Sequence, residues 1–347
     1  MKFLNGGWLV KDGFSVKYAA NIYTANIEPK KLTLFCPFGS PIYNAGMTLD
    51  GGILTIEVTS PREDVITTKL INFKKDRSNC PKFGLNETDP DVEIDETDDK
   101  WTFTSGRLTL EIAKGETIDF KYLYDGKVIA HSGWRAKGLV TDPEGQLHVS
   151  EQLDLGVGEK IYGLGERFTN FIKNGQTVDI WNEDGGTGTE QAYKNIPFYL
   201  SNRKYGLFVD NPGKVSFSRV QFSVPGEEMS YSVVGGENLK AILNTYTDLT
   251  GKAPLVPDWS YGLWLSTSFT TDYDEKTVLE FVDGMAERNI PLSVFHFDCR
   301  WMKELEWCNF DWDKSKFPDP EGLLKKLHDR GLKICVWINS YIGQKSP

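Results

Sequence analysis

Two side chains stand where apolar runs of the sequence end: Asp298 and Trp337. The carboxylate of Asp298 can accept charge-assisted hydrogen bonds from hydroxyl groups. The face of Trp337 can stack on a sugar ring. Each residue also has a purely structural alternative, a carboxylate that caps a loop or pairs with a cation, and a tryptophan that fills a core. His296 should point to the same side of its strand as Asp298, and we expect it to be a packed residue rather than a base.

The apolar runs that carry these residues are expected to be strands of a parallel sheet. They cover residues 261–269, 292–298 and 332–338, and patterns typical of helices lie between them. This alternation predicts parallel pairing with right-handed crossovers. It fits either a doubly wound sheet or an eight-stranded barrel. No glycine-rich phosphate turn follows the first run, which disfavours a nucleotide-binding sheet.

The two helices have recognisable starts. Asp272 and Glu275 have the spacing of a capping box, and a stripe of apolar residues follows at helical spacing from Val278 onward. Asp319 and Pro320 occupy the cap and first-turn positions of the second helix. In a barrel, functional side chains gather at the carboxyl ends of the strands and in the loops that follow.

The loop after the second strand is rich in aromatic residues, and a solvent-facing cluster of rings has no use in a pure scaffold. We therefore expect these rings to face solvent near a ligand site; they are Trp307, Phe310, Trp312 and Phe317.

The first 250 residues have the pattern of a β-sandwich. Apolar and polar residues alternate in many short runs, and the dipeptide Asp125-Gly126 suits a tight hairpin turn. The three-residue step between Phe217 and Val220 predicts a bulge within one strand. We therefore expect an all-β sandwich over residues 1–250, followed over residues 251–347 by the first three βα units of a truncated (β/α)8 barrel.

Composition excludes several classes of partner. The net charge of −10 argues against nucleic acid and against an anionic membrane surface. The five cysteines are odd in number and irregularly spaced, which disfavours a disulfide framework or a zinc site. We expect no metal and no cofactor. The N-terminus lacks the apolar run of a signal peptide, so a cytoplasmic location is expected.

Six segments together resemble glycoside hydrolase family 31, with most likeness to its bacterial α-xylosidase branch. The segments are Tyr162–Phe168, Trp181–Gly186, Gln191–Phe198, Phe295–Cys299, Phe317–Gly322 and Lys333–Asn339. The resemblance implies retaining hydrolysis of terminal α-xylosyl residues at non-reducing ends. It also implies that both catalytic aspartates belong to later barrel strands, beyond Pro347, so the chain is expected to be an inactive portion of the enzyme with no catalytic residue of its own.

The same resemblance implies roles for residues that line the −1 subsite. Asp298 matches the aspartate that holds the 4-hydroxyl group, and Trp337 matches a tryptophan lining the subsite. Phe269 and Cys299 match residues that crowd the space of a hexose C6 group, which would exclude the bulkier sugar.

Two further residues are assigned by resemblance to the neighbouring +1 subsite. Asp184 matches an acid on a sandwich loop that reaches toward that subsite. Arg300 stands where the α-xylosidase branch has an aromatic residue, which bears on the aglycone more than on the sugar that is cleaved.

Other functions remain open on the sequence. An α-glucosidase of the same family and a non-catalytic carbohydrate-binding protein are alternatives, and a structural module is a third. The expected ligand is an α-xyloside or α-glucoside oligosaccharide. The third barrel strand should present an unpaired edge, which is compatible with association into a homo-oligomer or with a missing part.

Overall fold

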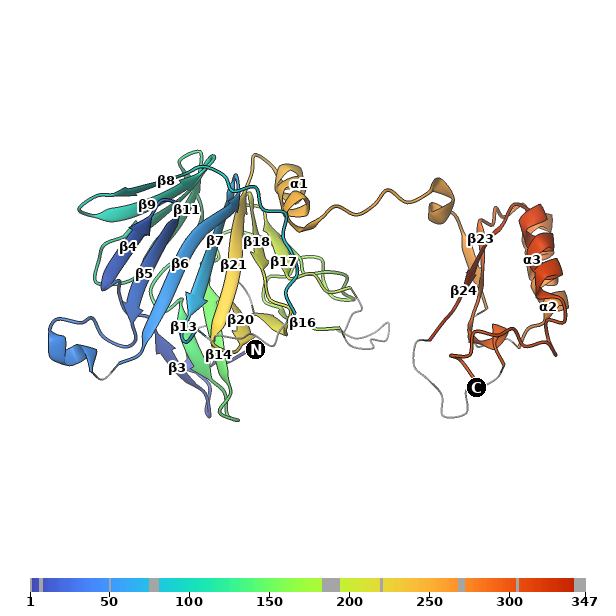
Figure 1. The fold of residues 1–347 in the computed structure, drawn as a ribbon, viewed down its shortest axis with the longest axis horizontal. Helices are drawn as coiled ribbons and strands as arrows, with labels where there is room; N and C mark the ends of the chain where they lie inside the picture. Colours follow the sequence, from blue (N-terminus) through green and yellow to red (C-terminus); the bar gives the residue numbers. More distant parts are fainter. Residues whose placement is uncertain are drawn as a thin grey trace. The chain divides into compact units, whose positions relative to one another are not determined.

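The computed structural model describes residues 2–5, 9–49, 51–74, 81–182, 194–218, 221–267, 272–303 and 306–339. The chain divides into two compact units, Met1–Lys252 and Ala253–Pro347, called unit 1 and unit 2 below (Figure 1). No helix among the described residues is both long enough and apolar enough to cross a membrane.

Unit 1 is built from three large antiparallel sheets and a short pair, β1 and β2 (Leu4–Asn5 and Leu9–Val10). The eight-stranded sheet has the order β15-β17-β18-β21-β7-β6-β5-β4. Its strands are β4 (Thr24–Glu28), β5 (Lys31–Pro37), β6 (Ile53–Arg62), β7 (Val65–Ile71), β15 (Ile161–Gly163), β17 (Phe198–Ser201), β18 (Tyr205–Val209) and β21 (Glu228–Gly235).

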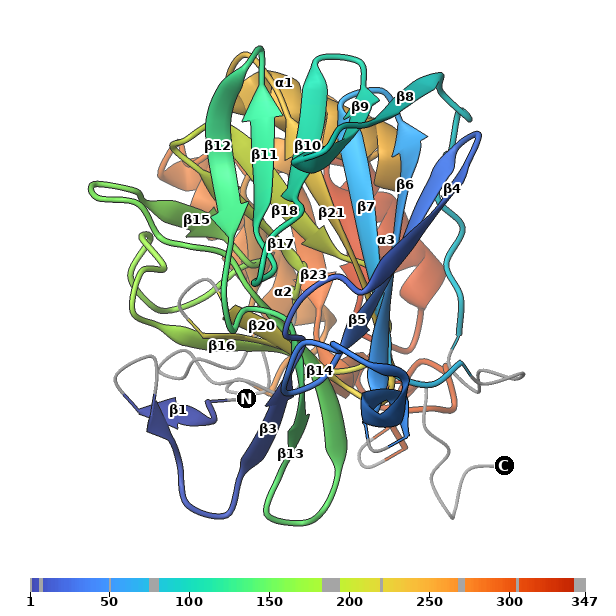
Figure 2. The same ribbon diagram turned by 90° about the vertical axis from the view of Figure 1, so that its left-hand side faces the viewer.

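The other two sheets have six and five strands. The six-stranded sheet, in the order β16-β19-β20-β14-β13-β3, contains β3 (Ser15–Tyr18), β13 (Gly138–Thr141), β14 (Leu147–Gln152), β16 (Thr177–Ile180), β19 (Val215–Ser218) and β20 (Gln221–Pro225). The five-stranded sheet, whose strands β10 to β12 lie side by side in Figure 2, runs in the order β12-β11-β10-β9-β8 and contains β8 (Val92–Glu96), β9 (Lys100–Ser105), β10 (Leu108–Ala113), β11 (Phe120–Tyr124) and β12 (Lys127–Ser132).

In many strands of unit 1, alternating residues place one face in a common core, as the sequence predicts. On β10, Leu108, Leu110 and Ile112 are fully buried while the intervening residues are partly exposed. One cluster of buried side chains takes members from all three large sheets. The predicted Asp125-Gly126 hairpin is confirmed, because both residues have positive φ and join β11 to β12.

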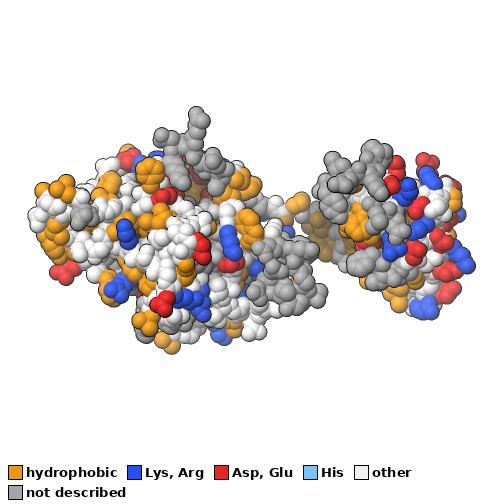
Figure 3. Space-filling model, turned by 90° about the horizontal axis from the view of Figure 1, so that it is seen from below, with side chains coloured by type: hydrophobic (Ala, Val, Ile, Leu, Met, Phe, Trp, Pro, Cys, Tyr) orange, Lys and Arg blue, Asp and Glu red, His pale blue; other side chains and the backbone are white. Residues whose placement is uncertain are grey.

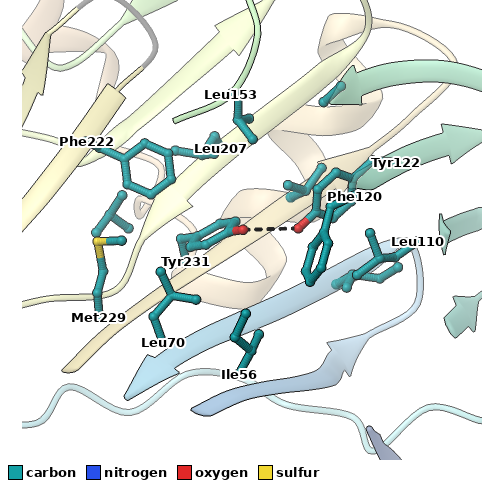
Figure 4. Close-up of a cluster of buried hydrophobic side chains, with 14 of the residues drawn as sticks. Ile56, Leu70, Leu110, Phe120, Tyr122, Leu153, Leu207, Phe222, Met229 and Tyr231 are labelled. Carbon is teal, nitrogen blue, oxygen red and sulfur yellow. Dashed lines mark hydrogen bonds between the residues drawn. The ribbon is translucent and has the colours of Figure 1, made fainter. Parts of the chain in front are cut away.

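A chain of polar groups runs through this core. The hydroxyls of Tyr122 and Tyr231 lie 3.3 Å apart (Figure 4), and the Tyr231 hydroxyl donates to Glu151 Oε2 at 3.0 Å. Ser132 donates to Glu151 Oε1 and accepts from Lys137 Nζ. Both charged side chains are buried, with Lys137 Nζ 3.4 Å from Glu151 Oε2. Burial lowers the pKa of Lys137, an effect that the Glu151 carboxylate opposes.

Two predictions for unit 1 are wrong. Ser218 pairs with Gln221, and Phe217 with Phe222, so β19 and β20 are separate antiparallel strands rather than one bulged strand. Unit 1 is also not entirely β, because helix α1 (Leu239–Thr250) packs on the eight-stranded sheet. The Asn238 side chain caps α1 by accepting from the Ala241 backbone N–H.

Unit 2 contains a three-stranded parallel sheet in the order β22-β23-β24. Its strands are β22 (Trp264–Ser266), β23 (Val294–Phe297) and β24 (Lys333–Val336), and its helices are α2 (Glu275–Glu287) and α3 (Pro320–Asp329). Parallel pairing is confirmed. No helix follows β24 within the residues described up to position 339, so the third βα unit stays a prediction. Short 3-10 helices are η1 (Ala45–Thr48), η2 (Asp258–Tyr261) and η3 (Cys299–Trp301).

The helices of unit 2 cover one face of this sheet. Val278 and Val282 of α2 and Leu323 and Leu327 of α3 share a core cluster with Phe295 and Phe297 of β23. Acidic and basic side chains intermingle on the outer surface of unit 2 (Figure 3), where α2 and α3 are joined by Lys326–Glu275 and Arg330–Asp283 ion pairs.

The helix starts agree with the sequence in one case and differ in the other. Asp319 caps α3, as predicted, by accepting from the Gly322 backbone N–H at 3.0 Å. The cap of α2 is Asp274, which accepts from the Thr277 N–H at 2.9 Å, so the predicted capping box at Asp272 is wrong. Glu275 is the first residue of the helix, whereas a capping box would require it to be the third. Asp272 instead forms ion pairs with Arg300 and Lys316, which come after β23 in the sequence.

Candidate functional site

Asp298 and Trp337 lie beside each other at the carboxyl ends of adjacent strands. Phe297 of β23 pairs with Val336 of β24, and the Trp337 backbone N–H continues the ladder by donating to the Phe297 carbonyl at 2.7 Å. Asp298 and Trp337 are therefore neighbours at the first position after each strand, where ligand sites of parallel βα folds gather.

The direction of each side chain on β23 follows from its neighbours. Phe295 and Phe297 are buried against the helices. Because successive side chains of a strand point to opposite faces, His296 and Asp298 belong to the face away from the helices. The Nδ1 atom of His296 lies 3.0 Å from Ser266 Oγ on β22. His296 is partly buried and paired across the sheet, which fits the packed role expected of it.

The carboxylate of Asp298 does cap a turn. Its Oδ1 accepts from the backbone N–H of Cys299 at 2.7 Å, at the start of η3. Its backbone carbonyl accepts from the hydroxyl of the buried Tyr273 at 2.7 Å, which fixes the strand end. Among the described residues, no nitrogen or hydroxyl group donates to Oδ2. The structural alternative thus accounts for one carboxylate oxygen and leaves the other for a ligand hydroxyl.

Cys299 is a packed thiol next to this carboxylate. Its side chain is 4% exposed, and it forms no disulfide. Burial raises the pKa of the thiol, and the hydrogen bond and charge of Asp298 raise it further. Since the thiolate is the reactive form, Cys299 is suited to shaping the site by volume rather than to attacking a substrate.

Trp337 is positioned by a residue that sequence reasoning missed. The Nε1–H of the buried Trp301 donates to the Trp337 carbonyl at 2.7 Å. The Trp337 ring meets Trp307 edge to face, with ring centroids 5.6 Å apart. A buried tryptophan needs a partner for its indole N–H. The sequence shows a tryptophan three residues after Asp298, but it does not show which carbonyl this N–H would reach.

Most aromatic residues of the loop after β23 fill the core instead of facing solvent. Phe317 is fully buried, Trp312 packs edge to face on Phe297, and Trp307 is partly buried. Phe310, at 52% exposure, is the exception. The expectation of a solvent-facing aromatic cluster is therefore wrong, because the short sheet needs these rings to seal the end of its core.

Arg300 is held beside the site by an ion pair that the sequence did not reveal. Its guanidinium lies 3.5 Å from Asp272 Oδ1, an atom that also accepts from Lys316 Nζ at 2.7 Å. The hydrogen bond from Lys316 lowers the pKa of Asp272, and Arg300 lowers it further. The longer contact leaves Arg300 the more weakly held of the two cations.

The remaining predicted residues, Phe269 and Asp184, lie outside the described residues. Within the described part of the chain, no group of three or more His, Cys, Asp or Glu side chains is arranged to hold a metal ion. The described cysteines are free thiols. A site made of a carboxylate, an indole and a neutral thiol can bind and select a polyhydroxylated ligand.

Comparison with known proteins identifies the family. The model of the glycosyl hydrolase 31 N-terminal galactose mutarotase-like domain matches residues 55–218, and the model of the glycosyl hydrolases family 31 TIM-barrel domain matches residues 253–347. The chain belongs to glycoside hydrolase family 31. The site built on β23 and β24 thus lies in the segment that matches the family's barrel domain.

Two relatives that align with the whole chain are named alpha-xylosidases. The chain is 49% identical to the alpha-xylosidase XylQ of Lactiplantibacillus pentosus and 46% identical to an alpha-xylosidase of Emericella nidulans; each alignment covers all of this chain but 46% and 48% of the relative. The chain therefore spans about half the length of these relatives. A solved GH31 dextranase of Flavobacterium johnsoniae, in complex with glucose, superposes with a TM-score of 0.77 at 24% identity, over 94% of this chain and 39% of that one, which shows the shared fold.

Proposed function

We propose that the chain is part of a retaining α-glycosidase that removes terminal α-xylosyl residues from the non-reducing ends of oligosaccharides. The observation that carries the proposal is the position of Asp298 and Trp337 next to each other at the ends of adjacent strands. Both lie in a segment that matches the family's barrel domain. The whole-chain likeness to two proteins named alpha-xylosidase supports the xyloside as substrate.

In this proposal the residues of unit 2 bind the sugar. The Oδ2 atom of Asp298 accepts a hydrogen bond from a sugar hydroxyl, while Oδ1 keeps its hydrogen bond from the Cys299 N–H. Trp337, tied down by Trp301, offers its ring to the sugar. Cys299 limits the space beside the sugar together with Phe269.

Two residues are proposed to act on the aglycone side. Asp184 is assigned there by resemblance alone. Arg300 keeps donors available because its contact with Asp272 is long.

The bond-breaking groups are proposed to lie in later barrel strands. Retaining hydrolysis uses two carboxyl groups roughly 5–5.5 Å apart, one as nucleophile and one as acid/base. The family resemblance assigns both to strands that would complete a (β/α)8 barrel after the three seen here. We therefore propose that the 347-residue chain binds sugar weakly and does not turn it over.

The test compares two substrates and two proteins. A longer protein that contains this chain and the later strands should hydrolyse p-nitrophenyl α-xyloside faster than p-nitrophenyl α-glucoside, and Asp298→Ala in it should lower kcat/KM at least about tenfold, since a charge-assisted hydrogen bond is lost. The 347-residue chain should release no nitrophenol from either substrate. Turnover by the purified chain contradicts the second statement.

An α-glucosidase is the second candidate function. Cys299 is buried and presents little surface to a C6 group, so exclusion of a hexose depends mainly on Phe269. Preference of the longer protein for the glucoside would establish this alternative. If the longer protein binds sugar saturably but turns over neither substrate, it is instead a carbohydrate-binding protein.

A further inference from the structure

Unit 1 contains a cavity whose described lining includes none of the residues to which sugar binding is assigned above. Its volume is about 540 Å³, within the range of small-molecule sites. The described lining residues all belong to unit 1. They come from the end of β16 and the residues after it, from β18 and the turn after it, from α1, and from residues 83–85.

Aromatic side chains form the apolar part of this cavity. Trp181 and Phe83 line it and are 48% and 72% exposed, so their ring faces are accessible. Tyr246 of α1 lines it as well, and this ring stacks on Phe198 with centroids 3.8 Å apart and meets Phe208 edge to face. The cavity thus combines a fixed aromatic wall with two open rings of the kind that pack against the C–H face of a sugar.

A carboxylate without a partner supplies the hydrogen-bond acceptor. Asp210, directly after β18, also lines the cavity. Its side chain makes no hydrogen bond or ion pair with the described residues, although its backbone N–H donates to the Ser230 carbonyl. The Asp210 side chain is exposed to solvent but partly desolvated by its neighbours, which raises the pKa of this carboxyl, and the charge of Glu87 raises it further. Hydroxyl groups of a ligand would supply the donors that this carboxylate lacks.

A chain of amides supplies the hydrogen-bond donor. The Arg167 guanidinium donates to Asn195 Oδ1, and Asn195 Nδ2 donates to Asn182 Oδ1 at 2.6 Å. This order leaves the Asn182 side-chain NH₂ as a donor without a hydrogen-bond acceptor among the described residues. Both Asn182 and Asn195 line the cavity. The cavity therefore offers a donor, an acceptor and aromatic faces.

We infer that this cavity binds a pyranosyl unit of an oligosaccharide. Hydroxyl groups both donate and accept, so they fit Asn182 and Asp210 together, while the sugar's C–H face fits Trp181. A phosphate would be repelled by Asp210, and an apolar ligand would leave that carboxylate unpaired. A simple cation would satisfy Asp210 but would make no use of the Asn182 donor. The inference needs no catalysis and does not depend on the proposed function.

Titration calorimetry on the 347-residue chain, with D-xylose, D-glucose and maltotriose as probes, tests this inference. We expect saturable binding of at least one probe with a Kd on the order of 1 mM. Trp181→Ala should weaken binding at least about threefold through lost stacking. Asp210→Asn, which keeps the shape but removes the charge, should weaken it about tenfold.

Two control variants locate the binding. Trp134→Ala removes another exposed tryptophan of unit 1 that does not line the cavity, and it should leave the affinity unchanged. Asp298→Ala removes the carboxylate proposed to bind sugar in unit 2, and the binding component that Trp181→Ala and Asp210→Asn weaken should persist in it, which separates this inference from the proposed function. Thermal unfolding of each variant checks that it is folded.

Three results would overturn the inference. They are the absence of saturable binding to every probe, binding that persists unchanged in both Trp181→Ala and Asp210→Asn, and binding that is lost only in Asp298→Ala. Trp181→Ala and Asp210→Asn act through different interactions, so a folding defect in one leaves the other decisive.

Discussion

The two units place apolar and charged side chains in opposite ways. Unit 1 buries the Lys137–Glu151 ion pair among three sheets that cover one another's apolar faces. Unit 2 keeps its ion pairs at partly exposed positions of its helices and loops, and it exposes apolar side chains on or beside its short strands, including Trp264, Val336 and Ile338. The sandwich closes its own core, whereas in unit 2 two helices cover one face of the parallel sheet, and no further strand of the described residues pairs with β22 or β24.

The largest expected loss of stability follows from breaking the buried ion pair of unit 1. Lys137→Met removes the ammonium group and leaves the Glu151 carboxylate buried with neutral donors, which should cost about 3–5 kcal/mol of unfolding free energy. Adding Glu151→Gln should recover part of this loss. Urea unfolding followed by circular dichroism measures it. The exposed pair Lys30–Asp89 gives the control, since Lys30→Met should change stability by less than about 1 kcal/mol.

The next effect concerns the strand ends of unit 2. Trp301→Phe removes the indole donor and leaves the Trp337 carbonyl without that bond, which should cost about 1–3 kcal/mol. Differential scanning calorimetry should show the loss in the transition of unit 2. Trp264→Phe is the matched control, because its Nε1–H also donates to a carbonyl, that of Ser260, but at an exposed site. Equal losses in the two variants would contradict the role given to Trp301.

A smaller effect depends on pH in unit 1. Burial raises the pKa of Asp119, but hydrogen bonds from His131 and Lys121 outweigh burial and hold it below its usual value. A depressed folded-state pKa stabilises the fold above the unfolded value near 3.9 and ceases to do so as the pH falls through the folded value.

Asp119→Asn should therefore cost about 1 kcal/mol at pH 7, as the loss of a typical hydrogen bond does. The difference from the parent chain should shrink below about pH 4. Urea midpoints at a series of pH values measure this, with the exposed Asp91→Asn as control. A difference that grows toward low pH would reverse the assigned sign.

The smallest effect on stability concerns the open edge of unit 2. Val336→Lys places a charge on the outer strand β24, and surface changes of this kind shift stability by about 0.5 kcal/mol or less. Self-association should nevertheless fall, because a charged edge resists strand pairing. Sedimentation velocity measures it. Val157→Lys, at an exposed position of unit 1, should leave self-association unchanged.

Local patterns predicted the elements better than the contacts of the site. The alternation around Leu110 and the turn at Asp125-Gly126 were sufficient for the sandwich strands because each signal is contained in a few residues. Helix α1 was missed even though Asn238 is a good cap, since its apolar residues follow a long run of strands. The separation of β19 from β20 was missed because the sequence has no glycine or asparagine between Ser218 and Gln221.

Contacts between distant residues could not be predicted in the same way. Asp298 and Trp337 were found from their positions at strand ends. The bonds that hold them, from Tyr273 to the Asp298 carbonyl and from Trp301 to the Trp337 carbonyl, join residues 25 and 36 positions apart. No periodicity links such pairs. The aromatic loop was misjudged for the same reason, because only the folded sheet shows that Phe317 is needed in its core.

The bond from Trp301 to Trp337 has a consequence for exchanging parts between homologous enzymes. Trp301 belongs to the loop after β23 but supports the end of β24, and its own carbonyl accepts from the Asp313 N–H at 2.9 Å. Specificity loops of a barrel are often treated as separable modules. Here a graft of the loop after β23 has to carry residues 298–313 as one block, or the recipient loses the support beneath the next loop as well.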